Sequence, residues 1–437
     1  MRGFSFLLIL GLLSFSSFAQ KKGKTKLIVY GQGEAAMASA VQASNSGVPV
    51  LWINPEASFE SVLIEGAEVK QVDSYQNIDA GMWADFLKRS ISAKEYTDSI
   101  FNRAKSHLTP RISTNTFEKM IDSASNLTVL NGTSVRKISK SGKRWNIELS
   151  NGSQHKVFAV VDASSSAQLL GLVNQKEKLT KATDTISLVP ISQIYTSEVY
   201  RTSLFVKDQQ EEAIVPAAAV IKPYANNFFF LYGPEGILED LVETEENVPT
   251  KMLYGQALGA VAAYCAFFEI NYDKINIRTL QGELFAYRAR LLPFHDVAFE
   301  DVHSGIIQRT ALSGLIRGRM SDSTEMAGKL IFDVNSHVSS HEIEPIMRSL
   351  YTRSQIWFAD KSIEEMKLKD LLSLIKFVAL KGNEMDAAVQ KGWTQKFKFS
   401  GEYDPECLIT RRHVAVLIDT YLQPFNIKVN NKGNFVY

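Results

Sequence analysis

The stretch Lys26-Leu-Ile-Val-Tyr-Gly-Gln-Gly-Glu-Ala-Ala-Met-Ala-Ser-Ala-Val-Gln-Ala43 decides the fold. In it, a short apolar strand enters a Gly-x-Gly-x-x-Ala turn and continues as an amphipathic helix. Gly31 permits the tight turn, Gly33 leaves room for a phosphate, and Ala36 lets the helix pack closely on its strand. The amides and the dipole of the helix start would face the phosphates. The pattern predicts a nucleotide pyrophosphate site; the alternative is a glycine turn that matches by coincidence.

The segments that follow extend this unit. A second strand, Val48 to Ile53, comes at the distance typical of a βαβ unit. Helical spacing runs from Met82 to Leu108, and three short strands with Asn-Gly and Ser-Gly turn signals run from Leu127 to Ser150. The next apolar strand, Lys156 to Ala163, carries Asp162 near its end. We therefore expect an α/β fold: a Rossmann-like domain with a small antiparallel β meander.

A second glycine-containing helix is predicted further along the chain. Two buried strands, Ile214 to Ile221 and Asn227 to Tyr232, precede a nearly all-apolar helix from Thr250 to Phe268. Gly255 and Gly259 are four residues apart and share one face of this helix. They would allow another backbone or a flat ligand to come close. Plain close packing against a strand is the alternative.

From about Pro293 onward the chain is mostly helical and carries a repeat. Phe332-Asp333 in the first copy matches Tyr403-Asp404 in the second, 71 positions later. Each copy has a short loop, a Ser or Thr helix cap and an amphipathic helix after this dipeptide. Such units should stack into one module. We expect two domains, residues 26–292 and the helical repeat domain 293–437.

The N-terminus has the pattern of a secretory signal peptide, residues 1–19. One early positive charge, an apolar middle and the small-x-small site Ser17-Phe18-Ala19 support cleavage after Ala19. An uncleaved anchor is the alternative, although the apolar part is short for a membrane span. We expect an exported bacterial protein, periplasmic or extracellular, with no membrane span after cleavage.

Composition narrows the function classes. The 437 residues are 45% hydrophobic and 22% charged, enough for a large core. A formal net charge of +1 gives no electrostatic case for nucleic acid or an anionic surface. With only Cys265 and Cys407, a disulfide framework is excluded, while a single disulfide remains open.

The order of motifs from Leu27 to Leu284 resembles the FAD-dependent oxidoreductase family of exported bacterial proteins. The resemblance rests on the first glycine turn, the Val-Val-Asp-Ala strand from Val160 to Ala163, the strand Ile214 to Ile221, and the Gly-Gln-Ala-x-Gly helix. It implies FAD as the cofactor and a redox reaction carried by the flavin. The substrate would be an unknown small-molecule or glycan-related compound, and no catalytic acid or base is identified.

The resemblance also implies a set of cofactor-binding residues. Asn54 would contact the adenosine ribose, and Val135 would bond adenine through its backbone. Asp162 lies in the segment that runs under the cofactor in that family. Gly255 and Gly259 would face the isoalloxazine ring, while the first glycine turn holds the pyrophosphate.

Three departures from the family pattern weaken this assignment. Asn54 stands where Asp or Glu normally holds the ribose, so no charge-assisted bond is available. The usual Gly-Gly segment is replaced by Phe59 to Leu63, and Glu246 to Pro249 stands where an arginine is common. The second hypothesis is therefore an exported binding or structural protein that keeps the flavoprotein fold without FAD.

The C-terminal repeats resemble surface-layer-homology modules in the segments Ala298 to Val302, Ile306 to Gly318 and Tyr403 to Arg411. This resemblance implies a cell-envelope polysaccharide as a possible partner, beside a purely architectural role. His337 and His341 have helical metal-pair spacing, but no third ligand is near in sequence, so no metal site is predicted.

Overall fold

A six-stranded sheet lies at the centre of the computed structural model, which describes residues 24–66, 69, 72, 76–174, 188–207, 211–221, 223–232, 244–359 and 361–437. The strand order is β11-β12-β7-β1-β2-β3, parallel except for β11. The strands are β1 (Leu27–Tyr30), β2 (Val50–Ile53), β3 (Leu127–Leu130), β7 (Ala159–Asp162), β11 (Pro223–Ala225) and β12 (Phe228–Phe230). The predicted signal peptide, residues 1–19, lies outside the described residues.

Both faces of the parallel sheet are covered. Val29 and Trp52 point into a core shared with helices α1 (Gly33–Asn45) and α7 (Val248–Phe268). Ile28 and Leu51, one residue earlier on the same strands, point into a second core on the opposite face. That face is covered by α5 and a three-stranded antiparallel meander. Its strands are β4 (Val135–Ser141), β5 (Arg144–Leu149) and β6 (Gln154–Val157), and α5 spans Gln168–Asn174.

A second, smaller sheet packs beside α7 in the order β8-β10-β9. Further helices surround it and the edge of the main sheet. The strands of this sheet are β8 (Val189–Pro190), β9 (Ser203–Lys207) and β10 (Ala213–Pro216). The surrounding helices are α2 (Gly81–Ser90), α3 (Asp98–Lys105), α4 (Pro110–Asp122), α6 (Ala217–Val220) and α8 (Ile277–Ala286). Short 3-10 helices are η1 (Ile191–Gln193), η2 (Glu198–Thr202), η3 (Glu245–Asn247), η4 (Tyr272–Lys274) and η5 (Pro424–Asn426).

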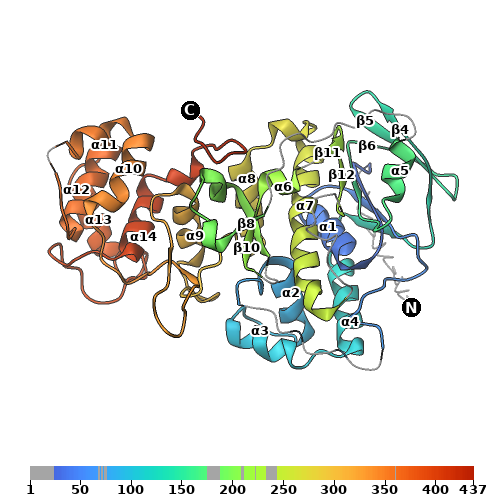
Figure 1. Ribbon diagram of the computed structural model, residues 1–437, viewed down its shortest axis with the longest axis horizontal. Coiled ribbons are helices and arrows are strands. Elements are labelled where there is room, and N and C mark those ends of the chain that lie inside the picture. The colour runs from blue at the N-terminus through green and yellow to red at the C-terminus, as the bar shows by residue number, and fades with distance from the viewer. Residues whose placement is uncertain are drawn as a thin grey trace, which may run out of the picture.

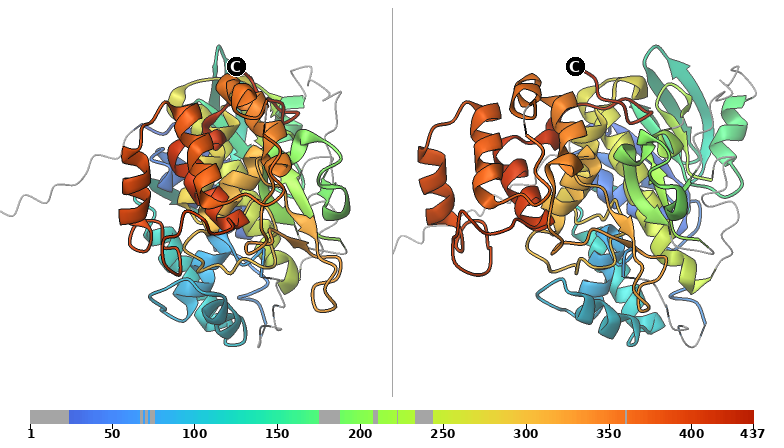
Figure 2. Two further views of the ribbon diagram at one scale, coloured as in Figure 1. Left: turned by 90° about the vertical axis from the view of Figure 1, so that its left-hand side faces the viewer. Right: turned by 60° about the vertical axis from the view of Figure 1, so that its left-hand side comes forward.

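The C-terminal region is helical, and it lies at the end of the molecule away from the meander (Figures 1 and 2). The predicted boundary between residues 292 and 293 falls between α8 and α9. The elements of the C-terminal region are α9 (Ser304–Ser313), β13 (Arg319–Met320), β14 (Leu330–Ile331), α10 (Ser340–Leu350), α11 (Thr352–Trp357), α12 (Leu368–Ala379), α13 (Glu384–Gly392) and α14 (Arg411–Tyr421). None of the helices in the described residues is both long and apolar enough to cross a bilayer.

Three copies of one unit, rather than the predicted two, meet in this helical region. The amide of Val338 donates to the carbonyl of Ile409 (3.3 Å), that of Ile409 to Met366 (3.0 Å), and that of Met366 to Val338 (3.0 Å). Each of these residues stands two positions before the first residue of α10, α12 or α14. The middle copy escapes the sequence pattern because Lys367, not Ser or Thr, occupies the N-cap position of α12.

The α/β fold class is confirmed, and several element predictions need correction. The strand expected from Lys156 to Ala163 is two strands, β6 in the meander and β7 in the parallel sheet. β3 belongs to the parallel sheet and not to the meander. The strand expected from Ile214 to Ile221 ends at Pro216, where α6 begins. Helical spacing from Met82 to Leu108 corresponds to two helices, α2 and α3. Cys265 and Cys407 are free thiols, not a disulfide.

Candidate active site at the carboxyl edge of the sheet

Helices α1 and α7 run side by side in the same direction. A Cβ atom on Gly255 would lie 2.3 Å from the carbonyl oxygen of Ala35, and one on Gly259 would lie 2.4 Å from that of Ser39. Each contact further along α7 therefore falls further along α1, so the two helices are parallel. Because α1 begins directly after β1, both helix starts lie at the carboxyl edge of the parallel sheet. Two positive helix-dipole ends therefore meet at one edge.

The same contacts correct the predicted role of the second glycine pair. Gly255 and Gly259 face the backbone of α1, at distances that leave no room for a ligand between the helices. Their small size lets another backbone, that of α1, come close, which the sequence analysis gave as one expectation. The expected contact with the flavin ring is wrong, and the packing partner is a helix and not a strand. The start of α7, one to two turns earlier, remains at the sheet edge.

The first glycine turn has the backbone conformation that the sequence predicts. Gly31 has φ +130° and Gly33 has φ +82°, values that L side chains rarely adopt. A Cβ on Gly31 would lie 2.4 Å from the carbonyl oxygen of Ala163, so Gly31 lets the end of β1 approach the end of β7. Nothing lies within 4 Å of a Cβ on Gly33, and Ala36 is fully buried under the helix.

This turn occupies the position where open parallel sheets bind ligands. β1 lies between β2 and β7, and the chain continues through α1 on one face but reaches β7 through the meander on the other. Such a switch in direction leaves a crevice outside the carboxyl ends of the two strands. Within the described residues, the buried Oε1 of Gln32 has no hydrogen-bond partner there. The turn therefore holds an amide group that a ligand could satisfy.

The start of α7 contributes two further polar side chains. Thr250 and Lys251 lie in its first turn, and each is only 1% exposed. The Oγ1 atom of Thr250 has no hydrogen-bond partner among the described residues. The unsatisfied hydroxyl of Thr250 at a helix start suits a ligand with oxygen acceptors.

One acidic side chain opposes an anion at the start of α1. Glu34 lies in the first turn of the helix, is 2% exposed, and accepts a hydrogen bond from the Oγ of Ser61. Ser61 belongs to the segment that replaces the Gly-Gly pair of the resembled family. A carboxylate at this position already interacts favourably with the helix dipole and repels a second negative charge.

The side chain of Asn54, the predicted ribose contact, is buried and hydrogen-bonded within the protein. Its side chain is 0% exposed and uses both ends internally. Nδ2 donates to the carbonyl of Ser58 (2.9 Å) and to Oδ1 of Asn131 (3.3 Å), while Oδ1 accepts from the amide of Glu56 (3.1 Å). In this conformation Asn54 does not fit a ribose, because no part of its amide is available to a hydroxyl.

The side chain of Asp162 forms hydrogen bonds within the protein. Its carboxylate is fully buried and accepts from the amide (3.1 Å) and hydroxyl (2.6 Å) of Ser164 and from the amide of Leu170 (2.9 Å). It thereby satisfies amides at the start of α5. Burial raises the pKa of this carboxyl, and these hydrogen bonds oppose the rise. Val135, the predicted adenine contact, is half-buried at the start of β4, opposite Leu149.

The structure contains a polar cluster that the sequence analysis did not identify. Glu212 and His295 are 83 positions apart, yet His295 Nε2 lies 3.0 and 3.2 Å from the two carboxylate oxygens. Asn77 donates to the same carboxylate (3.3 Å) and accepts from the guanidinium of Arg290 (3.0 Å). No short-range sequence pattern indicates this cluster, because the residue before β10, the loop before α2 and the loop after α8 supply its members.

The cluster is tied to α7 through the start of α2. Asn77 stands four residues before Gly81, and a Cβ on Gly81 would lie 2.1 Å from Oε1 of Gln256 on α7. The amide of Met82 donates to the same atom (2.9 Å). The loop that carries Asn77 is thus anchored by Gly81 and Met82 on the middle of α7.

The described residues include no group of three or more His, Cys, Asp or Glu side chains arranged to bind a metal ion. His341 is half-exposed and bonds to the hydroxyl of Ser362 (2.9 Å).

Residues 26–197 match the model of the FAD dependent oxidoreductase family. This match covers less than half of the chain. No curated protein has a significantly similar sequence.

Several solved structures are distantly similar to this chain. THI4 of Thermovibrio ammonificans has 12% identity and a TM-score of 0.32, over 55% of this chain and 89% of that one. Bacillithiol disulfide reductase from Staphylococcus aureus has 13% identity and a TM-score of 0.24, over 32% and 38%. T. acidophilum thioredoxin reductase has 14% identity and a TM-score of 0.21, over 40% and 41%. The chain thus spans less than half of the two reductases, and the likenesses carry no functional argument.

Proposed function

We propose that residues 26–292 form a FAD-binding domain with an oxidoreductase function on a small molecule. The observation that carries the proposal is the meeting of the starts of α1 and α7 at the switch point of the sheet, where two helix dipoles favour one anionic group. The family match over residues 26–197 supports the same conclusion. The substrate is proposed only as a small or glycan-related compound.

The residues at the two helix starts would hold the central part of the cofactor. Gly33 and the amides after it would bind the pyrophosphate, with Gln32 offering its unsatisfied amide to a hydroxyl. Thr250 would bind through its unsatisfied hydroxyl at the start of α7. When bound, FAD supplies hydride transfer, and the protein supplies orientation and electrostatics.

Glu212 and His295 are the side chains that we propose for proton transfer. The carboxylate holds the Nε2 side of the imidazole, which leaves Nδ1 as the atom that can exchange a proton with a substrate. A histidine oriented by a carboxylate is a common general acid or base.

A second candidate function is that of an exported binding or structural protein without FAD. Two observations favour it: the amide of Asn54 is fully used by the protein itself, and the carboxylate of Glu34 is buried at the start of α1. For FAD to bind, the loop from Asn54 to Ser61 must rearrange at its ribose end.

We also propose that the protein is exported and that its helical region interacts with the cell envelope. Residues 1–19 support export by their signal-peptide pattern. The ring of backbone hydrogen bonds among Val338, Met366 and Ile409 supports a repeat module, for which an envelope polysaccharide is the proposed partner.

The flavin content of the purified protein tests the first candidate against the second. We would purify the chain from Gln20 to Tyr437, record its visible spectrum and then titrate it with FAD. A flavin absorption band or saturable FAD binding is the expected result. A colourless, folded protein that does not respond to FAD would favour the second candidate.

A further inference from the structure

The β4–β6 meander concentrates positive charge in a chain that is nearly neutral overall. Its strands and turns, residues 135–157, contain one acidic residue, Glu148, against a larger set of basic residues. That set is Arg136, Lys137, Lys140, Lys143, Arg144 and Lys156. The net charge of the whole protein, +1, therefore hides a local basic surface.

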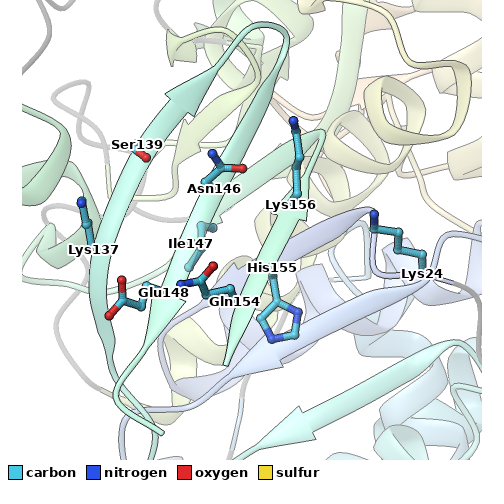
Figure 3. A pocket seen from close by; sticks show the side chains of 9 residues that line it. All are labelled: Lys24, Lys137, Ser139, Asn146, Ile147, Glu148, Gln154, His155 and Lys156. Carbon is cyan, nitrogen blue, oxygen red and sulfur yellow. The ribbon is translucent and has the colours of Figure 1, made fainter. Parts of the chain in front are cut away.

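Two of these basic side chains, Lys137 and Lys156, lie on the outer face of the meander. Lys137 lies opposite Glu148 across β4 and β5, and Asn146 lies opposite Lys156 across β5 and β6. The alternate residues, such as Ile147, point into the core instead. The outer face has a hollow of about 420 Å³, lined by Lys24, Lys137, Lys156 and polar neighbours (Figure 3).

The ammonium groups on this face are available to a partner. Lys24, Lys137 and Lys156 are exposed, and none of them forms an ion pair with a carboxylate among the described residues. The carboxylate of Glu148 forms an ion pair with Arg136, whose guanidinium lies 3.7 Å away, and not with Lys137. An anionic surface would meet these three lysines without first breaking an internal salt bridge.

An exposed aromatic pair lies next to the basic face. Phe267 and Phe268, at the end of α7, are each 54% exposed and have ring centroids 5.0 Å apart. Beside them is a groove of about 220 Å³ that includes Tyr264, Ala263 and Leu280. Large exposed aromatic side chains in contact with each other often mark an interaction surface.

Glu269 joins the two surfaces. It follows Phe268 directly, and its carboxylate lies 3.1 Å from Arg144 of the meander and 3.5 Å from Lys26. Lys26 stands immediately before β1, so the joined surface lies at the amino edge of the parallel sheet. The candidate active site lies at the opposite, carboxyl edge.

We propose that this joined surface, the lysines of the meander together with Phe267 and Phe268, docks on an anionic lipid bilayer. Basic side chains attract anionic headgroups, and exposed phenylalanines insert into the interface. Docking by the amino edge leaves the carboxyl edge open to solvent.

The aromatic pair favours a bilayer over other anionic partners. A nucleic acid or an acidic polysaccharide would use the lysines but would gain little from phenylalanines at the far side of Glu269. A second copy of the chain would use the phenylalanines but would be repelled by a like-charged meander. An anionic bilayer uses both kinds of side chain at once, since its headgroups attract the lysines and its interface accepts the phenylalanines.

Vesicle sedimentation with the chain from Gln20 tests the proposal, since that chain keeps every described residue. We expect binding to vesicles that contain phosphatidylglycerol, weaker binding to phosphatidylcholine alone, and a decrease with added salt. Lys137→Gln and Lys156→Gln should each weaken binding about fivefold, because one lysine near an anionic surface contributes about 1 kcal/mol. The double change Phe267→Ser, Phe268→Ser should weaken binding at least about tenfold.

Matched controls lie on the helical region. Lys381→Gln and Lys391→Gln remove the same charge from exposed positions, and Ile356→Ser with Leu380→Ser removes exposed apolar side chains. These should leave vesicle binding unchanged. Equal binding to neutral and anionic vesicles would overturn the proposal. So would absence of binding, heparin binding that persists while vesicle binding is absent, or a dimer in solution that depends on Phe267 and Phe268.

Discussion

Glu34 is the residue whose charge most affects the candidate site. It places a buried carboxylate in the first turn of α1, at the end of the helix that would otherwise attract a phosphate. Its hydrogen bond with Ser61 joins this turn to the loop after β2. The same side chain can therefore stabilise the fold without a ligand and weaken the binding of one.

Replacing this charge should strengthen FAD binding. In Glu34→Gln the side chain still accepts the bond from Ser61, but the repulsion of a pyrophosphate disappears. We expect FAD affinity to rise at least about tenfold, since even 1.4 kcal/mol gives that factor and unit charges close together interact more strongly. FAD titration monitored by flavin fluorescence measures the change.

Glu60→Gln provides the control, because Glu60 is exposed on the same loop. It removes one negative charge without touching the helix start, so the affinity should change little. If Glu34→Gln and Glu60→Gln behave alike, Glu34 has no special electrostatic role.

At the residue scale, the sequence analysis succeeds where a conformation is local. The positive φ angles of Gly31 and Gly33 follow from a short glycine pattern between a strand and a helix. The closure of Asn54 could not be predicted, because one of its partners, Asn131, is 77 positions away. The pairing of Glu212 with His295 is non-local for the same reason.

At the scale of elements, the packing of α1 on α7 depends on two missing side chains. Gly255→Ala or Gly259→Ala would place a Cβ less than 2.5 Å from a carbonyl oxygen of α1. Because a helix backbone cannot yield locally, we expect each change to lower the free energy of unfolding by about 1–3 kcal/mol. Urea denaturation followed by circular dichroism measures this loss.

The matched change Gly282→Ala should have the opposite sign. Gly282 lies inside α8 with nothing within 4 Å of an added Cβ. Alanine is favoured over glycine in a helix, so stability should rise by about 0.5–1 kcal/mol. A similar loss in all three variants would contradict the close approach of α1 and α7.

The start of α14 predicts a pH dependence. His413 Nδ1 accepts a hydrogen bond from the amide of Thr410 (3.1 Å), which requires a neutral imidazole. Burial, with Arg412 and His303 nearby, lowers the pKa of His413 to about 4, against about 6.5 in an unfolded chain. Between these values the unfolded state takes up the proton first, so the free energy of unfolding decreases as the pH falls. The loss should reach about 2–3 kcal/mol near pH 4.

His413→Gln isolates this contribution. Glutamine at the third helical position can still accept from the N-cap amide but does not titrate. The variant should lose less stability than the wild type between pH 6.5 and pH 4, measured by thermal unfolding. Parallel pH profiles for both proteins would show that His413 is not the titrating group.

At the scale of the whole molecule, Arg278 connects three parts of the chain. Its buried guanidinium donates to the carbonyls of Arg201 (3.1 Å), Leu312 (3.0 Å) and Ile427 (3.3 Å), and it stacks on Phe425. Burial, with Arg201 nearby, lowers the pKa of Arg278 to about 9. One side chain on α8 thus holds α9 and the C-terminal segment against the α/β part.

Removing these donors should destabilise the assembled protein. Arg278→Met keeps much of the side-chain volume but removes every hydrogen bond, and we expect a loss of about 2–4 kcal/mol. Differential scanning calorimetry measures it. Arg353→Met is the control, because Arg353 is exposed and bonds to one carbonyl, that of Phe377. Equal losses in the two variants would contradict the connecting role of Arg278.

The overall architecture could be predicted where it depends on local sequence patterns. The β1-turn-α1 unit, the helical nature of the C-terminal region and the α/β class follow from periodicity and glycine positions. The assignment of β3 to the parallel sheet could not be predicted, since strand pairing depends on the path of the chain between strands. The middle copy of the helical unit could not be predicted, because lysine, the residue type at position 367, is not typical of a helix N-cap.

The most direct test of the account compares two glycines at opposite ends of α1. Gly33 and Gly47 have φ values of +82° and +81°, and neither has an atom within 4 Å of an added Cβ. Gly33→Glu and Gly47→Glu therefore add the same strain and charge, but only the first lies at the proposed pyrophosphate site. FAD titration should show binding in the wild type and in Gly47→Glu, and none in Gly33→Glu. Equal FAD affinity in the two variants, or no binding by the wild type, would contradict the account.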